Sequence, residues 1–284
     1  MSTRSARQWQ RIIITSRDLT AHQTDVRLSD YVARRQPASG PDPDFAIDAA
    51  RVRRLRRTLL HWATTSGRHF FWRDAQVSAF EILVCEVLLA KTRAELVAPI
   101  ARALLDCCPN AHALTMLPRP ELERRLYPLG LHRKRARHLI ECAKALVRDF
   151  KGRVPETVEQ LMTLPYVGRY AANAIACVAF DQQVPVIDAN VSRIYQRIFS
   201  LPDPPERLAN AHLLWSFAAA VLPRGSAKAF NWAILDLGGT ICTAKAPACE
   251  RCPLAKLCDA RQAMIQTTPS RHASGVRKLP TAAA

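Results

Sequence analysis

The sequence predicts an all-α fold. From Ala46 onward, apolar residues recur at spacings of three and four, which is the periodicity of amphipathic helices. Few windows show the alternation that half-buried strands require, and Pro or Gly interrupts the helical pattern at intervals. With 284 residues, 49% of them hydrophobic, the chain is long enough to bury a core in one large domain or two small lobes.

The expected elements follow the chain in order. Residues 1–45 carry mixed charge and end in PASGPDPD, so we interpret them as an extension and linker. Each later helix is a run of helical periodicity between two breaks; the runs lie at residues 46–65, 76–90, 94–108, 119–127, 133–150, 156–163, 169–181, 189–199, 207–222 and 227–237. The residues after Cys258 are expected to form a loose basic tail.

The charge balance indicates a polyanionic partner. Lys and Arg outnumber Asp and Glu by 41 to 24, which gives a net charge of +17 and on its own also fits a ribosomal or membrane-surface protein. The positive residues gather in RVRRLRR (51–57), in HRKRARH (132–138) and, more weakly, in RHASGVRK near the end. One such cluster is as readily a solvated helix face, but three on a basic chain favour DNA, bound with strong salt dependence.

The sequence argues against a membrane or a disulfide framework. No apolar run approaches the roughly 18 residues of a membrane span, and the N-terminal MSTRSARQWQ lacks the apolar core of a signal peptide. We therefore expect no membrane partner and a cytoplasmic location. Nine cysteines, an odd number in a reducing compartment, do not suit a disulfide set.

Residues 164–188 read LPYVGRYAANAIACVAFDQQVPVID and predict two helices around a short hairpin. The turn runs through Pro165 and Gly168, and the second helix starts at about Arg169. Gly168 is expected to supply the positive φ of the turn. The amides of the turn and of the first helical turn then face outward, where they can hold the phosphates of one DNA strand without reading its sequence.

Four cysteines near the end have metal-ligand spacing. Cys242, Cys249, Cys252 and Cys258 form C-x6-C-x2-C-x5-C. Zinc usually takes two C-x2-C pairs or a Cys/His mixture, whereas one pair flanked by wider gaps favours a four-iron four-sulfur cluster, with zinc as the alternative. The other five cysteines are expected to be small core residues: Cys85, Cys107, Cys108, Cys142 and Cys177.

The pattern LPxVGxxxA followed by xxxDxxVxR resembles the helix-hairpin-helix DNA glycosylases, the base-excision superfamily that includes endonuclease III and the adenine mismatch glycosylases. The resemblance runs from about Phe71 to Cys258 and includes FNWAILDLGGTIC (230–242) and the cysteine spacing. It implies two helical lobes with the base pocket between them. One is a six-helix lobe with the helix-hairpin-helix, and the other is an iron-sulfur cluster lobe made from N- and C-terminal helices.

The resemblance also implies how the chain is divided. After the extension of residues 1–45, the expected parts are 46–72, an N-terminal helix packing in the cluster lobe; 73–185, the six-helix lobe; 186–260, the cluster lobe; and 261–284, the basic tail. We expect a monomer that binds double-stranded DNA containing a mismatched or damaged base.

Asp188 is the first candidate catalytic residue. It precedes a predicted helix, and aspartate is an excellent helix N-cap for purely structural reasons. The resemblance places the family's essential aspartate at this position, and both roles can hold together. A carboxylate near C1′ stabilises the positive charge that builds on the sugar as the N-glycosidic bond breaks.

Tyr170 and Glu86 complete the predicted catalytic set. Tyr170 stands where bifunctional relatives carry a lysine that forms a Schiff base with C1′, which a phenol cannot do; the alternative is an aromatic side chain packed on the hairpin. Glu86 is an acid within the apolar segment FEILVCEVLLAKT. Burial raises a carboxyl pKa, so Glu86 can deliver a proton to the departing base, unless it is only a partly exposed residue at the helix edge.

Further residues are implied as DNA contacts by their positions in the family pattern. They are Pro165, Val167, Gly168 and Arg169 of the hairpin, and Lys91, Thr92 and Arg93, where the family's helix end approaches the opposite strand. Tyr166 departs from the pattern, because the usual hairpin has a glycine there.

The sequence thus predicts a monofunctional DNA glycosylase of base excision repair that removes a flipped thymine or uracil opposite guanine. Adenine removal from A:G or A:8-oxoguanine stays open because of Glu86 and FNWAILDLG, although the 26 residues after Cys258 leave no room for the lesion-reading domain of those enzymes. A modified pyrimidine is a further alternative. A catalytically silent DNA-binding module is the alternative of another class.

Overall fold

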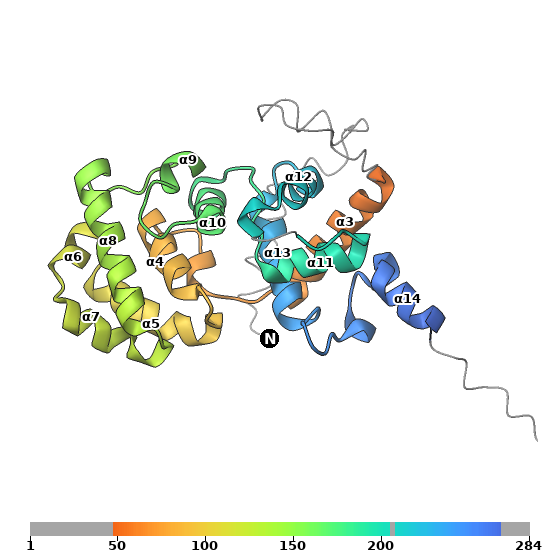
Figure 1. Ribbon diagram of the computed structural model, residues 1–284, viewed down its shortest axis with the longest axis horizontal. Helices are drawn as coiled ribbons and strands as arrows, with labels where there is room; N and C mark the ends of the chain where they lie inside the picture. The colour runs from red at the N-terminus through yellow and green to blue at the C-terminus, as the bar shows by residue number, and fades with distance from the viewer. Residues whose placement is uncertain (1–47, 205–207, 268–284) are drawn as a thin grey trace, which may run out of the picture.

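The computed structural model describes residues 48–204 and 208–267 (Figure 1). All regular structure in these ranges is helical, which confirms the predicted all-α fold. The helices form two groups, a hairpin lobe made of α4 to α10 and a cluster lobe made of α3 and α11 to α14. No helix in the described ranges is long and apolar enough to cross a bilayer.

The hairpin lobe contains α4 (Ala79–Leu89), α5 (Ala94–Cys107), α6 (Ala111–Met116), α7 (Arg119–Leu126), α8 (His132–Phe150), α9 (Val158–Leu161) and α10 (Arg169–Phe180). The cluster lobe contains α3 (Ala49–Ser66), α11 (Ala189–Phe199), α12 (His212–Val221), α13 (Ala227–Thr240) and α14 (Asp259–Thr267). The chain thus enters the cluster lobe with α3, crosses to build the hairpin lobe, and returns after α10 (Figure 1).

Three sequence expectations about these elements were wrong. The residues after Cys258 begin with helix α14, which packs against α11, instead of a loose tail. Helix α6 was not expected, and its start is stabilised by the Asn110 side chain, which accepts a hydrogen bond from the Ala113 amide. The expected helix 156–163 is reduced to α9. The predicted extension 1–45 lies outside the described residues, as does the end of the basic tail.

Each lobe buries its own core. In the cluster lobe, Phe217 is fully buried, and the rings of Tyr195 and Phe199 meet its ring edge-on at centroid distances of 5.3 and 4.9 Å. The core of the hairpin lobe is rich in leucine and includes three of the five cysteines that were expected to be core residues, and a fourth, Cys177, lies in the core of the cluster lobe. Cys107 is the exception, because its side chain is exposed.

Several arginines of the predicted basic clusters point into the fold. Arg51 donates to the Leu257 carbonyl at 2.7 Å and pairs with Asp259, which joins α3 to α14. Arg56 donates to the Val221 and Ala220 carbonyls, each at 2.8 Å, at the end of α12. Unsatisfied carbonyls at a helix C-terminus are good acceptors for such cations. Part of the positive charge therefore holds helices together.

Arg135 is the most deeply buried of these arginines, with 4% of its surface exposed. It donates to five oxygens: Val87 O at 3.4 Å, Leu88 O at 2.7 Å, Ala90 O at 3.0 Å, Thr92 Oγ1 at 2.5 Å and Gly130 O at 2.9 Å. One guanidinium thus ties the end of α4 to the loop before α8. Lys91 and Leu131, the residues after two of these acceptors, both have left-handed backbone conformations and exposed side chains.

We predict that Arg135→Met lowers the free energy of unfolding by at least about 2 kcal/mol, because buried carbonyls lose their donors. Denaturant unfolding followed by circular dichroism measures the change. Arg133→Met, two residues earlier on an exposed position of α8, is the matched control and should be close to neutral. Equal stability of the two variants would contradict the structural role of Arg135.

Candidate active site and metal centre

A cavity of about 860 Å³ lies between the two lobes. Its walls include the three predicted catalytic residues, Glu86 from α4, Tyr170 from α10 and Asp188 from the start of α11. These residues are far apart in the sequence. They line the same cavity because the chain returns from the hairpin lobe to the cluster lobe between Tyr170 and Asp188. The predicted contacts Lys91, Thr92 and Arg93 line the same cavity, on the turn that follows α4.

Both oxygens of the Asp188 carboxylate are held. Asp188 is the N-cap of α11, and its Oδ1 accepts a hydrogen bond from the Val191 amide at 2.8 Å. Its Oδ2 accepts from the Asn190 side-chain amide at 2.7 Å. The capping interpretation and a place in the cavity wall are thus both correct.

A chain of hydrogen bonds connects Asp188 to the cysteine loop. Asn190 Oδ1 accepts from Arg193 at 2.8 Å, and Arg193 donates in turn to the Cys242 carbonyl at 2.7 Å. Gly238 of α13 makes this approach possible, since a Cβ atom there would lie 2.7 Å from the Asn190 side chain. The sequence showed Asn190 and Arg193 only as part of a family pattern, because their partners are distant in the chain.

The segment before Asp188 is fixed by Asn231, which is 3% exposed. Its Oδ1 accepts from the Val186 amide at 3.1 Å, and its Nδ2 donates to the Val184 carbonyl at 2.9 Å. A side-chain amide thus supplies the hydrogen bonds that an adjacent strand would give to this extended segment. Asn231 of helix α13 therefore fixes the segment that leads to Asp188.

Glu86 has the surroundings of a proton carrier. Its Oε2 is shielded from solvent and has no hydrogen-bond partner within the described part of the chain, although the residue as a whole is only half-buried. Burial raises the Glu86 pKa to about 7; the nearby positive charge of Arg73 opposes this effect and the negative charge of Asp188 adds to it. Glu86 can therefore hold or release a proton near neutral pH.

Tyr170 faces the same groups. Burial raises its pKa well above the ordinary value, and the negative charges of Glu86 and Asp188 raise it further. The phenol therefore stays neutral at physiological pH. Its ring also packs against the core of the cluster lobe.

The hairpin corrects one expectation from the sequence. Gly168 has φ −87°, and the left-handed residue of the turn is Tyr166, with φ 64°. A side chain in this conformation costs about 1–2 kcal/mol. Two contacts from α8 offset the cost: the Tyr166 ring stacks on His138 with centroids 3.6 Å apart, and the Cys142 thiol donates to the Pro165 carbonyl at 2.7 Å.

The other hairpin residues take up different positions. Val167 is buried, and Gly168 is exposed at the start of α10. The Arg169 guanidinium lies 4.2 Å from the centre of the Trp215 ring and donates to the Ala209 carbonyl at 3.0 Å, so it connects α10 to the cluster lobe. Its backbone amide lies in the first turn of α10, where helix amides have no partner within the helix and can bind an anion.

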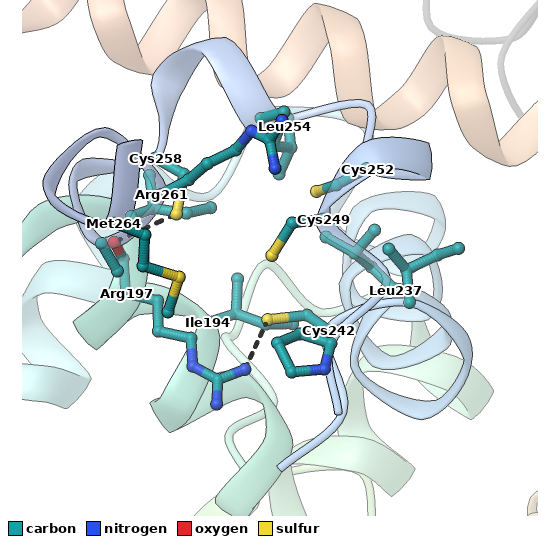
Figure 2. A pocket seen from close by; sticks show the side chains of 15 residues that line it. Ile194, Arg197, Leu237, Cys242, Cys249, Cys252, Leu254, Cys258, Arg261 and Met264 are labelled. Atoms are coloured by element: carbon teal, nitrogen blue, oxygen red, sulfur yellow. Dashed lines mark hydrogen bonds between the residues drawn. The ribbon is translucent and has the colours of Figure 1, made fainter. Parts of the chain in front are cut away.

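The four cysteines line one small cavity next to α11 and α13 (Figure 2). Two short 3₁₀ turns, Cys249–Arg251 and Ala255–Leu257, shape the loop that carries them. Arg197 donates to the Cys242 sulfur at 3.3 Å, and apolar side chains fill the base of the cavity: Ile194, Leu237 and Leu254. The thiols thus meet in a space that is apolar but has a cation at its edge.

This arrangement fits a cluster better than a single ion. Among the described residues, no three His, Cys, Asp or Glu side chains lie close enough together to hold one metal ion. A structural zinc site requires all four sulfurs at about 2.3 Å from one ion. Four thiolates that surround a wider space suit a cluster with several irons, whose negative charge a nearby arginine partly balances.

Comparison with known proteins agrees with this geometry. Residues 84–217 match the HhH-GPD superfamily of base excision DNA repair proteins. A thymine-DNA glycosylase of Aeropyrum pernix is 35% identical over 215 residues, which are 75% of this chain and 96% of that relative. The chain belongs to the HhH-GPD superfamily. Residues 242–258 match the iron-sulfur binding domain of endonuclease III, so its cofactor is the predicted four-iron four-sulfur cluster.

Two further similarities place this HhH-GPD protein among its relatives. An adenine DNA glycosylase of Mycolicibacterium smegmatis is 39% identical over 197 residues, 69% of this chain, and the match spans only 66% of that relative. The solved structure of a thermostable thymine-DNA glycosylase superposes with a TM-score of 0.71 at 29% identity, over 76% of this chain and all of that one. The predicted family is confirmed, and relatives acting on either base are similar.

We predict that the purified protein is brown and contains iron and acid-labile sulfide in about a four-to-four ratio. Cys249→Ser should lower the content of both, because it removes one thiolate from the cavity. Cys107→Ser, which changes an exposed thiol outside it, should leave both contents unaltered. Metal analysis and visible absorption spectra make the measurement, and a colourless, zinc-loaded preparation would contradict the site.

Proposed function

We propose that the chain is a monofunctional DNA glycosylase that hydrolyses the N-glycosidic bond of a thymine or uracil opposite guanine in duplex DNA. Membership of the superfamily makes it a DNA glycosylase, a hydrolase of base excision repair. The observation that carries the finer proposal is the content of the inter-lobe cavity, where a held carboxylate, a buried acid and a tyrosine in place of lysine face one space.

Asp188 is the group we assign to the sugar. Because both of its oxygens already accept hydrogen bonds, the carboxylate is fixed before the substrate arrives. At about 4 Å and an effective dielectric constant near 20, its attraction to a unit positive charge at C1′ is roughly 4 kcal/mol, on the order of a thousandfold in rate. The same carboxylate can orient the attacking water.

Glu86 is the group we assign to the base. Its buried Oε2, without a partner in the described part of the chain, is placed to donate a proton to an acceptor atom of the departing base. A pKa of about 7 suits this transfer, since general acids work best when their pKa is near the operating pH. The neutral Tyr170 phenol lies in the same cavity wall and can donate a hydrogen bond to the sugar or base.

The hairpin and the exposed basic side chains supply the contacts to the duplex. The amides at the start of α10 can hold one phosphate, with Pro165, Val167, Gly168 and Arg169 shaping the turn. Lys91, Thr92 and Arg93 are placed at the cavity rim, where they can fill the gap left by the flipped base. Exposed cations of the cysteine loop extend this surface: Lys245, Arg251 and Lys256.

The cluster has a structural role in this proposal. Cys242, Cys249, Cys252 and Cys258 hold it, and its presence orders the loop to which Arg193 and thereby Asp188 are tied. When bound, the group supplies rigid cross-linking of the loop and no chemistry on the base. The chain acts as a monomer, since all the assigned groups come from one copy.

Adenine removal is the second candidate activity. It is favoured by Glu86, because adenine departs more readily after protonation of the ring, and by the similarity to the mycobacterial adenine glycosylase. The thymine activity is preferred because the match to the thymine-DNA glycosylase spans nearly the whole of that relative.

A single-turnover assay distinguishes these activities. Duplexes with T:G, U:G, A:G, A:8-oxoguanine or an oxidised pyrimidine are incubated with the protein and then cleaved with alkali at abasic sites. We predict release from T:G and U:G, and a loss of at least about a thousandfold in Asp188→Asn with duplex affinity retained. No release from any duplex would leave a DNA-binding module, and a parallel loss of affinity in the variant would make Asp188 a structural cap.

The monofunctional assignment predicts that borohydride traps no covalent complex with a cleavable duplex, because neither Tyr170 nor Asp188 can form a Schiff base. Denaturing gels of reduced reaction mixtures provide the measurement, with a commercial lyase-active glycosylase as positive control. Lys91 lines the cavity as well, so Lys91→Ala is run in parallel. Efficient trapping that disappears in this variant would identify a lysine nucleophile and overturn the assignment.

A further inference from the structure

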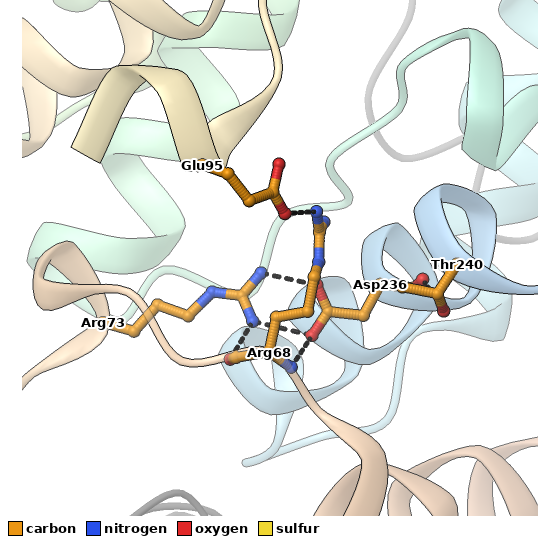
Figure 3. Close-up of polar contacts among 5 residues, drawn as sticks. All are labelled: Arg68, Arg73, Glu95, Asp236 and Thr240. Carbon is orange, nitrogen blue, oxygen red and sulfur yellow. Dashed lines mark hydrogen bonds and ion pairs between the residues drawn. The ribbon is translucent and has the colours of Figure 1, made fainter. Parts of the chain in front are cut away.

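Asp236 is the only acidic residue among the fully buried side chains of the described ranges, with 0% of its surface exposed. It lies on α13 and accepts four hydrogen bonds, two from Arg68 and two from Arg73 (Figure 3). Neither the family motifs nor the catalytic assignment gives it a task. Burying a carboxylate costs free energy because the charged group loses its hydration. A role is therefore expected for the contacts that Asp236 makes.

Arg73 is the more buried of the two partners. Its Nη1 and Nη2 donate to the two oxygens of Asp236 at 2.8 and 2.9 Å, which is the bidentate geometry of a strong ion pair. The guanidinium also lies 5.2 Å from the Trp232 ring centre, and its side chain is 5% exposed. Arg73 is therefore fixed, and its charge is balanced by a carboxylate from the opposite lobe.

Arg73 belongs to the wall of the catalytic cavity. It lines the same space as Glu86, Tyr170 and Asp188. Its positive charge opposes the rise in the pKa of Glu86 and that of Tyr170, so it is close enough to act on both groups. The position and net charge of this guanidinium thus bear directly on whether Glu86 carries a proton.

We infer that Asp236 is a positioning residue for the proton donor: by holding and neutralising Arg73 from helix α13, it lets Glu86 keep its proton in the pH range in which the enzyme works. This inference rests on the proposed role of Glu86. It gives the buried carboxylate of the cluster lobe a task in the chemistry of the hairpin lobe.

The directions in which neighbouring groups shift the Glu86 pKa support this role of Asp236. The facing groups are Arg73 before α4, the Cys85 thiol beside it on α4, Tyr170 on α10 and Asp188 at the start of α11. Burial and Asp188 raise the Glu86 pKa, and Arg73 alone lowers it. Without Asp236, the charge of Arg73 would be unbalanced, which would stabilise the carboxylate form of Glu86.

The experiment is the pH dependence of single-turnover base release. It uses the cluster-loaded protein and the duplex it cleaves best in the substrate assay. A general acid is active when protonated, so the rate should fall as pH rises through the Glu86 pKa. Glu86→Gln should abolish this falling limb. If the limb persists in Glu86→Gln, the proposed role of Glu86 fails before Asp236 is considered.

With that role established, Asp236→Asn should move the falling limb to lower pH by about one unit or more, while the rate on the acid plateau stays within a few fold. Glu95→Gln is the matched control, because Glu95 pairs with Arg68 at 3.4 Å in the same network but does not touch Arg73. The falling limb of the pH profile of this variant should stay where it is in the unmodified protein. A loss of rate at every pH in Asp236→Asn, with the limb unmoved, would overturn the inference and leave Asp236 a structural residue.

A second variant guards against poor folding of Asp236→Asn. In Arg73→Met the cation is removed, whereas Asp236 keeps its two hydrogen bonds from Arg68. The limb should then move to higher pH, opposite in sign to the first variant. Iron content and thermal unfolding are measured for every variant, and a limb that moves downward or not at all in folded Arg73→Met would contradict the inference.

Discussion

The hydrogen bonds of the Asp188 carboxylate are the constraint on which the site depends. One oxygen caps α11 and so needs that helix to begin at Ala189; the other needs Asn190, which Arg193 holds in turn. Arg193 also donates to the Cys242 carbonyl, so two side chains, Arg193 and Asn190, connect the cysteine loop to the Asp188 carboxylate. One chain of hydrogen bonds therefore connects the loop that binds the cluster, helix α11 and the candidate catalytic carboxylate.

The arginines of this chain have two roles, which depend on how far each side chain is buried: some connect helices, and others are exposed and available to phosphate. Arg51, Arg56 and Arg135 take helix-end carbonyls as partners and connect elements that are distant in the sequence. Their planar, always charged head groups can satisfy several acceptors at once, which a lysine could not do. The cations left exposed are those available to phosphate. A strongly basic composition thus overstates the charge that DNA encounters.

The sequence was most informative where the physical signal is local. The helical period, the cysteine spacing and an aspartate before a helix are each set by neighbours in the chain, and the structure has them as expected. The turn was misjudged because glycine is the usual left-handed residue, whereas here the stacking of Tyr166 on His138 supports that conformation from another helix. Asp236 was missed for the same reason: inside FNWAILDLG it has no visible partner, since both arginines precede it by more than 160 residues.

Gly238 shows how far such dependence reaches. It contacts no substrate, lies outside the cavity wall and would pass in a sequence comparison as one small residue within a helix. Yet α13 packs so closely on Asn190 that no methyl group fits between them, and Asn190 in turn donates a hydrogen bond to Asp188. A glycine-to-alanine change at this position would add only one methyl group. Because the added Cβ atom would lie 2.7 Å from the Asn190 side chain, this change would push Asn190 away from the position in which it donates to Asp188.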